Sequence, residues 1–252
     1  MATTTWLGAE KSSAQRSALT VNPNPTEHLV LMCASALFTG LSQRECTEIV
    51  SCARARTFAR DELLFSQGQP VRSLMFLQSG SVKQTQVSQN GSEVLLRMSG
   101  TGEAVNVQGE SGSCNHTCSA RAMEQCKALV WEYGKLQLLL AQYPQIRKNI
   151  SQILAGRLRE LEERFREVAT EKVAKRLALV LLRLMKQIGK PEADGIQVSL
   201  SREELAQMTG TTLFTISRVL SRWAELGFVT PRREAVLVND SQRLESLSGE
   251  EE

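Results

Sequence analysis

Residues 200–227 read LSREELAQMTGTTLFTISRVLSRWAELG, and they predict two short helices joined by a tight turn. Ser201 and Glu204 have the spacing of a capping box, in which each side chain accepts a hydrogen bond from a backbone N–H at the start of a helix. Gly210 follows, where a left-handed turn residue costs little, and Thr211 or Thr212 can cap the second helix. Apolar side chains then recur at helical spacing, which predicts one buried stripe made of Ile216, Val219, Leu220 and Trp223.

The opposite face of the second helix carries small polar, apolar and basic side chains. An Arg can donate two hydrogen bonds to guanine, Ser and Thr reach bases or phosphates, and an apolar side chain can contact a thymine methyl. An ordinary helical hairpin would also present a solvated polar face, but the turn between the two helices favours DNA binding. The residues predicted to face DNA are Thr212, Leu213, Phe214, Ser217, Arg218, Ser221 and Arg222.

The segment after the second helix, FVTPRREAVLVND at 228–240, has two apolar runs around a polar turn. It predicts a two-stranded wing with Arg232 and Arg233 at its tip, where they would contact phosphates. Between residues 212 and 233 there are four Arg and one Glu, a local excess of +3. The whole chain is only mildly basic, with a net charge of +3, so this local excess is the part that favours contact with phosphates.

The composition limits the other classes of protein. The chain has 252 residues, of which 42% are hydrophobic, which is enough for one large or two modest domains. No apolar run approaches the roughly 18 residues of a membrane span, and the N-terminus lacks the apolar core of a secretory signal. We therefore expect a cytoplasmic protein with no membrane partner, whose six Cys are thiols or ligands. We expect no enzyme, because no nucleophile motif, phosphate-binding loop or paired-carboxylate cleft stands out in the sequence.

The first half of the chain predicts a flexible tail at 1–28 and a β-rich domain at 29–135. The domain opens with two helical pieces, the second starting at a capping box of Ser42 and Glu45. Between 57 and 130 short apolar runs alternate with Gly-containing turns, and Asn90-Gly91 is a strong hairpin signal. This pattern predicts a small antiparallel barrel or jelly roll whose interior can hold a small ligand.

A long helical pattern follows, which we assign to a dimerisation helix at 136–169. Its apolar residues alternate between spacings of four and three, as in a coiled-coil seam, so two copies would pair along it. The alternative is that this stripe packs against the chain's own barrel. A further helix at 171–188 is the first element of a predicted DNA-binding domain at 170–244. Residues 245–252 are predicted to form an acidic tail. The predicted seam consists of Leu154, Leu158, Leu161, Phe165 and Val168.

The order of barrel, long helix and winged helix–turn–helix resembles the Crp/Fnr family of bacterial transcription regulators. The resemblance covers roughly residues 30–240 and is carried by FARDELLFSQGQPVRSLMFLQSGSVK at 58–83 and GTTLFTISRVLSRWAELGFV at 210–229. It implies an α+β protein with an N-terminal double-stranded β-helix, the jelly roll of cyclic-nucleotide-binding domains, as its sensor. It also implies a homodimer that binds a near-palindromic promoter site and acts on RNA polymerase. Ser217-Arg218 matches the pair with which many Fnr-like members read bases, whereas Phe214 stands where the family often has Glu. Phe214 or Leu213 could instead contact a thymine methyl.

The sensor region departs further from the family. Members that bind cyclic AMP hold its phosphate with an Arg followed by Ser or Thr, but His116-Thr117 occupies that place, and Arg121 belongs to the following strand. Cyclic AMP is therefore disfavoured, because bidentate capture of the phosphate needs the Arg.

Three other sensor hypotheses stay open beside incidental buried thiols. The first is an iron–sulfur cluster, although no N-terminal C-x2-C run exists to hold an Fnr-type cluster. The second is haem bound through the sequence CNHTC, and the third is a thiol switch. The residues concerned are Cys114, His116 and Cys118 for the last two, with Cys33, Cys46, Cys52 and Cys126 as further candidate cluster ligands.

Overall fold

The computed structural model describes residues 33, 35–91, 93–107 and 114–249. The tail predicted at 1–28 lies outside the described residues. Within them the chain forms an α+β protein with a β-roll, a long helix and a winged helix–turn–helix domain, as the sequence predicts. No helix in this part of the chain is long and apolar enough to cross a membrane.

The β-roll consists of two antiparallel sheets that face each other. One sheet has the order β1-β7-β3 and the other β2-β6-β4-β5. Phe58, Leu77, Val82 and Ala120 come from both sheets and are fully buried between them, so the roll has its own core. The strands are β1 (Arg54–Phe58), β2 (Leu63–Phe65), β3 (Ser73–Ser79), β4 (Val82–Val87), β5 (Glu93–Ser99), β6 (Ser119–Ala122) and β7 (Cys126–Glu132).

The Asn90-Gly91 signal marks the turn between β4 and β5, which pair antiparallel. Gly91 has φ +83°, and its N–H donates to the carbonyl of Ser88 at 3.0 Å. A residue without a side chain adopts this left-handed conformation at little cost, so the predicted hairpin is confirmed.

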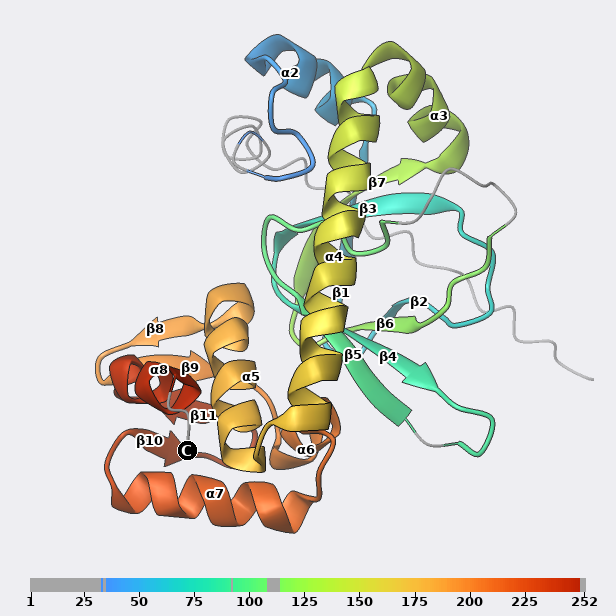
Figure 1. Cartoon of the computed structure of the whole chain (residues 1–252). Coiled ribbons are helices and arrows are strands. Elements are labelled where there is room, and N and C mark those ends of the chain that lie inside the picture. Colours follow the sequence, from blue (N-terminus) through green and yellow to red (C-terminus); the bar gives the residue numbers. More distant parts are fainter. Residues whose placement is uncertain (1–32, 34, 92, 108–113, 250–252) are drawn as a thin grey trace, which may run out of the picture.

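Three helices pack together at one end of the β-roll: α2 (Gln43–Ser51), α3 (Tyr133–Gln142) and the start of α4 (Pro144–Thr170). Figure 1 shows α4 running alongside the β-roll towards the C-terminal domain. The prediction of a single helix at 136–169 is wrong at its start. The helical conformation is interrupted at Tyr143 (φ −121°, ψ 77°), and α4 begins at Pro144. A proline lacks the N–H that a continuous helix needs and is favoured in the first turn of a new one.

The C-terminal domain packs α5 (Val173–Ile188), α6 (Arg202–Thr209) and α7 (Leu213–Glu225) around one apolar core. Its sheet has the order β10-β11-β9-β8, with the wing strands β10 (Val229–Pro231) and β11 (Val236–Val238) joined to a hairpin of β8 (Lys190–Glu192) and β9 (Gly195–Val198). The predicted acidic tail at 245–252 starts too early. Residues 241–249 form α8 (Ser241–Gly249), whose Leu244 is fully buried in the domain core.

The two domains share part of this core. Leu95 and Met98 of β5 are buried in the same cluster as Leu177 and Leu181 of α5. Beside them Lys83 of β4 reaches Glu204 of α6 at 2.8 Å. The β-roll therefore contacts the C-terminal domain directly as well as through α4.

Candidate nucleic-acid interface

The turn between α6 and α7 has the geometry that its sequence predicts. The Ser201 hydroxyl accepts from the backbone N–H of Glu204, whose carboxylate accepts in return from the backbone N–H of Ser201 at 2.9 Å. Gly210 ends α6 in the left-handed region, with φ +61°. Thr212 then caps α7 by accepting from the backbone N–H of Thr215 at 3.3 Å. Together these local bonds fix the angle at which α7 leaves α6.

One face of α7 anchors the helix in the domain core. Ile216 and Leu220 are fully buried, Trp223 is 4% exposed, and the Trp223 ring lies 5.4 Å from that of Phe228. Val219 is half-buried and packs against the same cluster. The predicted stripe is therefore confirmed, and it turns the opposite face of α7 outwards.

The outward face presents the side chains that the sequence predicted to meet DNA. Phe214 is 84% exposed and Leu213 46%, so both apolar side chains are open to a partner. Ser217 is half-buried at the edge of this face. The exposed members are Thr212, Leu213, Phe214, Arg218, Ser221 and Arg222, and we call these six with Ser217 the α7 face.

The wing carries the two predicted phosphate contacts, but the structure treats them differently. Arg232 pairs with Glu192 of β8 at 2.9 and 3.0 Å and also contacts Gln197 of β9. This carboxylate raises the pKa of Arg232, so the guanidinium already has an anionic partner. Arg233 is exposed beside it at the wing tip. The prediction that both arginines contact phosphates stays a prediction, and for Arg232 such a contact would compete with Glu192.

The predicted dimer seam is largely an exposed apolar stripe on α4. Phe165 is 76% exposed, Leu161 58%, Leu158 57% and Val168 46%. Leu154 differs, because it is half-buried against the cluster formed by α2, α3 and the start of α4. We call Leu158, Leu161, Phe165 and Val168 the α4 stripe; each of them is at least 46% exposed in the single chain.

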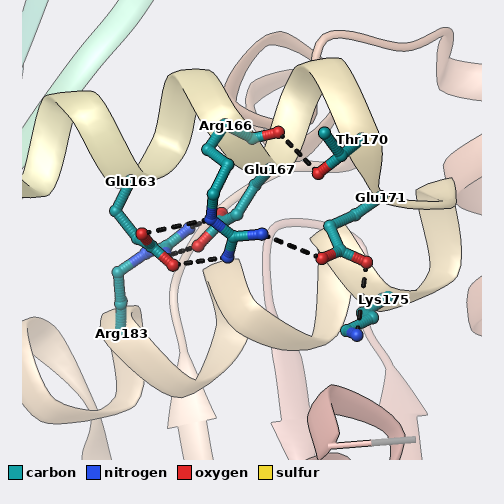
Figure 2. A network of polar contacts seen from close by, with 7 residues as sticks. All are labelled: Glu163, Arg166, Glu167, Thr170, Glu171, Lys175 and Arg183. Atoms are coloured by element: carbon teal, nitrogen blue, oxygen red, sulfur yellow. Dashed lines mark hydrogen bonds and ion pairs between the residues drawn. The ribbon is translucent and has the colours of Figure 1, made fainter. Parts of the chain in front are cut away.

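Ion pairs at the junction of α4 and α5 connect the long helix to the C-terminal domain (Figure 2). Glu167 is 3% exposed and accepts two hydrogen bonds from Arg183 of α5, at 2.5 and 2.7 Å. On the solvent side Arg166 bridges Glu163 at 2.6 Å and Glu171 at 3.1 Å. The buried pair joins α4 directly to α5, the first helix of the C-terminal domain.

The candidate sensor residues lie in three different environments. His116 is 5% exposed and stacks on Phe65, with ring centroids 3.9 Å apart and planes 13° apart. Its Nδ1 is buried without a hydrogen-bond partner, and burial lowers the pKa of His116. Cys118 is buried, with its Sγ 3.8 Å from Oε1 of Gln84, and burial raises its pKa. Cys114 is exposed.

These environments bear on the sensor hypotheses. Within the described residues, which include all six cysteines, no group of three or more His, Cys, Asp or Glu side chains could hold a metal ion. The cysteines therefore do not gather into a ligand set for an iron–sulfur cluster. Haem through His116 and a thiol switch at Cys114 and Cys118 remain hypotheses.

The arginines near the β-roll are engaged by groups of the protein itself. Arg121 donates to the carbonyl of Asp61 at 2.6 Å, and Glu103 pairs with Arg97 at 3.3 Å. Arg157 of α4 reaches the roll, where it donates to the carbonyl of Ala104 at 2.6 Å. Burial, with the nearby charge of Arg97, lowers the pKa of Arg157 to about 10.

A β-roll joined through a long helix to a winged helix–turn–helix, with an outward-facing α7, defines a two-domain transcription regulator that binds DNA. Comparison with known families agrees. Residues 55–143 match the family described as cyclic nucleotide-binding domain, and residues 175–247 match the Crp-like helix-turn-helix domain. The chain belongs to the Crp/Fnr family of transcription regulators.

Three similar proteins illustrate the match. The chain is 26% identical over 216 residues to a CRP-like cAMP-activated global transcriptional regulator of Mycobacterium tuberculosis, covering 85% of this chain and 96% of that protein. It is 29% identical over 217 residues to the cyclic AMP receptor protein of Thermus thermophilus, covering 86% and 98%. The solved structure of the c-di-GMP responsive global regulator CLP of Xanthomonas campestris is 25% identical, with a TM-score of 0.67, and the match covers 79% of this chain and all of that one.

Sequence reasoning missed the side chains that join the domains. Lys83 and Glu204 are 121 residues apart, and Glu204 was recognised only for its role in the capping box. The ion pair of Arg183 with Glu167 has no signal in the sequence, because charged residues are common on helix surfaces. The β8–β9 hairpin, which binds Arg232, did have a weaker signal, because Asp194 at its turn and Gly195 at the start of β9 are residues common in turns.

Proposed function

We propose that this regulator binds DNA as a homodimer that inserts the α7 face of each subunit into the major groove of a near-palindromic promoter site. The α7 face carries this proposal, because it leaves Phe214 and Arg218 exposed while the other side of the helix anchors it. In this arrangement Ser217 and Arg218 read base edges, and Phe214 or Leu213 contacts a thymine methyl. Arg222, Thr212 and Ser221 contact phosphates or bases at the edges of the groove.

Two copies are proposed because a single helix–turn–helix is a weak DNA binder and dimers are the usual solution. The α4 stripe supports this pairing, since four large apolar side chains on one helix are left in water when the chain is alone. Pairing along α4 would place two α7 helices on one side of the dimer, about one turn of DNA apart. The bound dimer would then act on RNA polymerase in the cytoplasm.

The wing supports the α7 face without reading sequence. Arg233 is the first candidate for a phosphate contact, since Arg232 is held by Glu192. Arg232 would contribute only if a phosphate displaces that carboxylate.

The signal at the β-roll is proposed to differ from cyclic AMP captured through a phosphate-binding Arg. His116 supports this, because it is stacked and buried at the position where that Arg belongs. Calorimetric titration of the dimer with cyclic AMP tests the proposal. We expect no saturable heat, and saturable binding would contradict it.

DNA binding itself is tested by the salt dependence of affinity for a duplex selected from a random library. Fluorescence anisotropy should show affinity falling steeply with added salt, because each phosphate contact releases counterions. Arg233→Ala should weaken binding to all duplexes alike and lower the salt slope by about 1. A flat salt response would mean that the helix–turn–helix is a protein-interaction hairpin.

A further inference from the structure

Two cysteines that lie outside the proposed DNA and sensor sites contact each other. The Sγ of Cys33 lies 3.6 Å from the Sγ of Cys46, which is van der Waals contact between sulfurs. Cys33 is exposed, whereas Cys46 is fully buried in α2, within the cluster that α2 forms with α3 and α4. The Cys33 thiol is therefore accessible to small reagents, and the buried Cys46 thiol is in contact with it.

The buried partner is held in a fixed place. The indole Nε1–H of Trp131 donates to the carbonyl of Ile49 in α2 at 2.9 Å. The Tyr143 hydroxyl contacts Glu48 on the same helix. Asn149 of α4 donates to the carbonyl of Leu37 at 2.9 Å, which fastens the segment before α2 as well. Because α2 is anchored at these points, the Cys33 side chain is the one that must move for the two sulfurs to approach each other.

The distance left to close is small. A disulfide has sulfurs about 2.05 Å apart, so the two must approach by about 1.6 Å. The other buried thiols face different groups: Cys118 contacts Gln84, and Cys126 lies 3.3 Å from the carbonyls of Ser81 and Glu124.

We propose that Cys33 and Cys46 are a redox modification site, at which a peroxide converts the two thiols into an intramolecular disulfide. The Cys33 sulfur attacks one peroxide oxygen, the O–O bond breaks, and Cys33 becomes a sulfenic acid while one water leaves. The Cys46 sulfur then attacks the Cys33 sulfur, the S–O bond breaks, and the second water leaves with the Cys46 proton. Two thiols and one hydrogen peroxide thus give one disulfide and two waters, with two electrons passing from sulfur to peroxide.

The order of the two steps follows from the surroundings. Burial, together with the contact from Cys33, raises the pKa of the Cys46 thiol to about 12, so Cys46 stays protonated at neutral pH and is shielded from solvent. The thiolate is the nucleophile in both steps, so the exposed Cys33 reacts first, and Cys46 becomes nucleophilic in the second step only as its proton passes to the departing water. The resulting bridge would fasten residue 33 to α2, and a cytosolic reductant would reverse it.

The site is tested on the full, reduced chain treated with hydrogen peroxide and then with an alkylating reagent. We expect two of the six thiols to be lost and the mass to fall by two hydrogens, both restored by dithiothreitol. Trypsin cleaves after Arg44 and Arg54, so the bridge should join the peptide with Cys33 to the peptide 45–54, and fragmentation of that peptide should assign the bond to Cys46 and not to Cys52. Cross-links between other cysteines, or between chains, would overturn the proposal.

Three variants sharpen the test. Cys33→Ser changes an exposed side chain and should abolish the bridge while leaving Cys46 unmodified. Cys46→Ala should leave a sulfenic acid on Cys33 that dimedone traps; a second measurement, circular dichroism, checks that this buried change keeps the fold. Cys52→Ser is the matched control at the end of the same helix and should form the bridge as the unaltered chain does. Equal oxidation of Cys33 to higher acids with and without Cys46 would show that the two thiols do not cooperate.

Discussion

Replacing Leu161 by Asp in the middle of the α4 stripe should separate the dimer into monomers. Leu161 is 58% exposed in the single chain, and full burial of a Leu side chain is worth about 1.5–3 kcal/mol, so pairing gains roughly 1–2 kcal/mol from each copy. Both subunits lose this contribution, about 2–4 kcal/mol in all, and two carboxylates are placed in an apolar seam. At about 1.4 kcal/mol per factor of ten, the dimer dissociation constant should rise by about a hundredfold or more.

Sedimentation equilibrium over a range of concentrations measures this change. Leu138→Asp is the matched control, because Leu138 is 72% exposed but lies on α3, outside the stripe. The control should dimerise as the unaltered chain does, and both variants should keep the same helical content by circular dichroism. A Leu161→Asp protein that dimerises as tightly as the control would refute the assignment of the α4 stripe as the dimer interface.

Two further changes test how the DNA-binding domain is held in place. Glu167→Gln should lower the free energy of unfolding by roughly 2–3 kcal/mol, somewhat less than for a wholly buried pair, because Arg183 keeps 25% of its side chain exposed. Glu163→Gln, in an exposed pair of the same network, should change the free energy of unfolding little. Equal losses for the two variants in urea unfolding would contradict the role given to the buried pair. Gly210→Ala should destabilise the turn by about 1 kcal/mol, because its φ of +61° strains any residue with a Cβ although no atom lies closer than 3.7 Å. Gly134→Ala, in α3 and with open space around it, should instead stabilise the protein slightly, and a loss equal to that of Gly210→Ala would show that backbone strain is not the cause.

The parts of the fold that could be predicted from sequence are those fixed by neighbouring residues. The capping box at Ser201 and Glu204, the left-handed Gly210 and the cap at Thr212 each depend on bonds within four residues. The Asn90-Gly91 hairpin is local in the same sense. The boundary of α4 was also within reach, because Pro144 signals a new helix start.

The remaining features depend on residues that meet only in the folded chain. Lys83 and Glu204 are 121 residues apart, and Arg232 pairs with Glu192 across 40 residues. Sequence periodicity places such charges on a solvated face but does not choose their partners. Likewise, the sequence grouped the cysteines by spacing, whereas the structure brings Cys33 and Cys46 together by packing.

Selection of binding sites from random duplex DNA, with the unaltered chain and with Arg218→Ala in parallel, tests the central claim most directly. The account predicts an inverted repeat with half-sites about one helical turn apart for the unaltered chain. With Arg218→Ala one base pair should lose its preference at the same place in both half-sites, and affinity for the original site should fall by about 1–3 kcal/mol. An identical motif from both proteins, or no enriched motif at all, would contradict the claim that α7 reads DNA from a two-fold dimer.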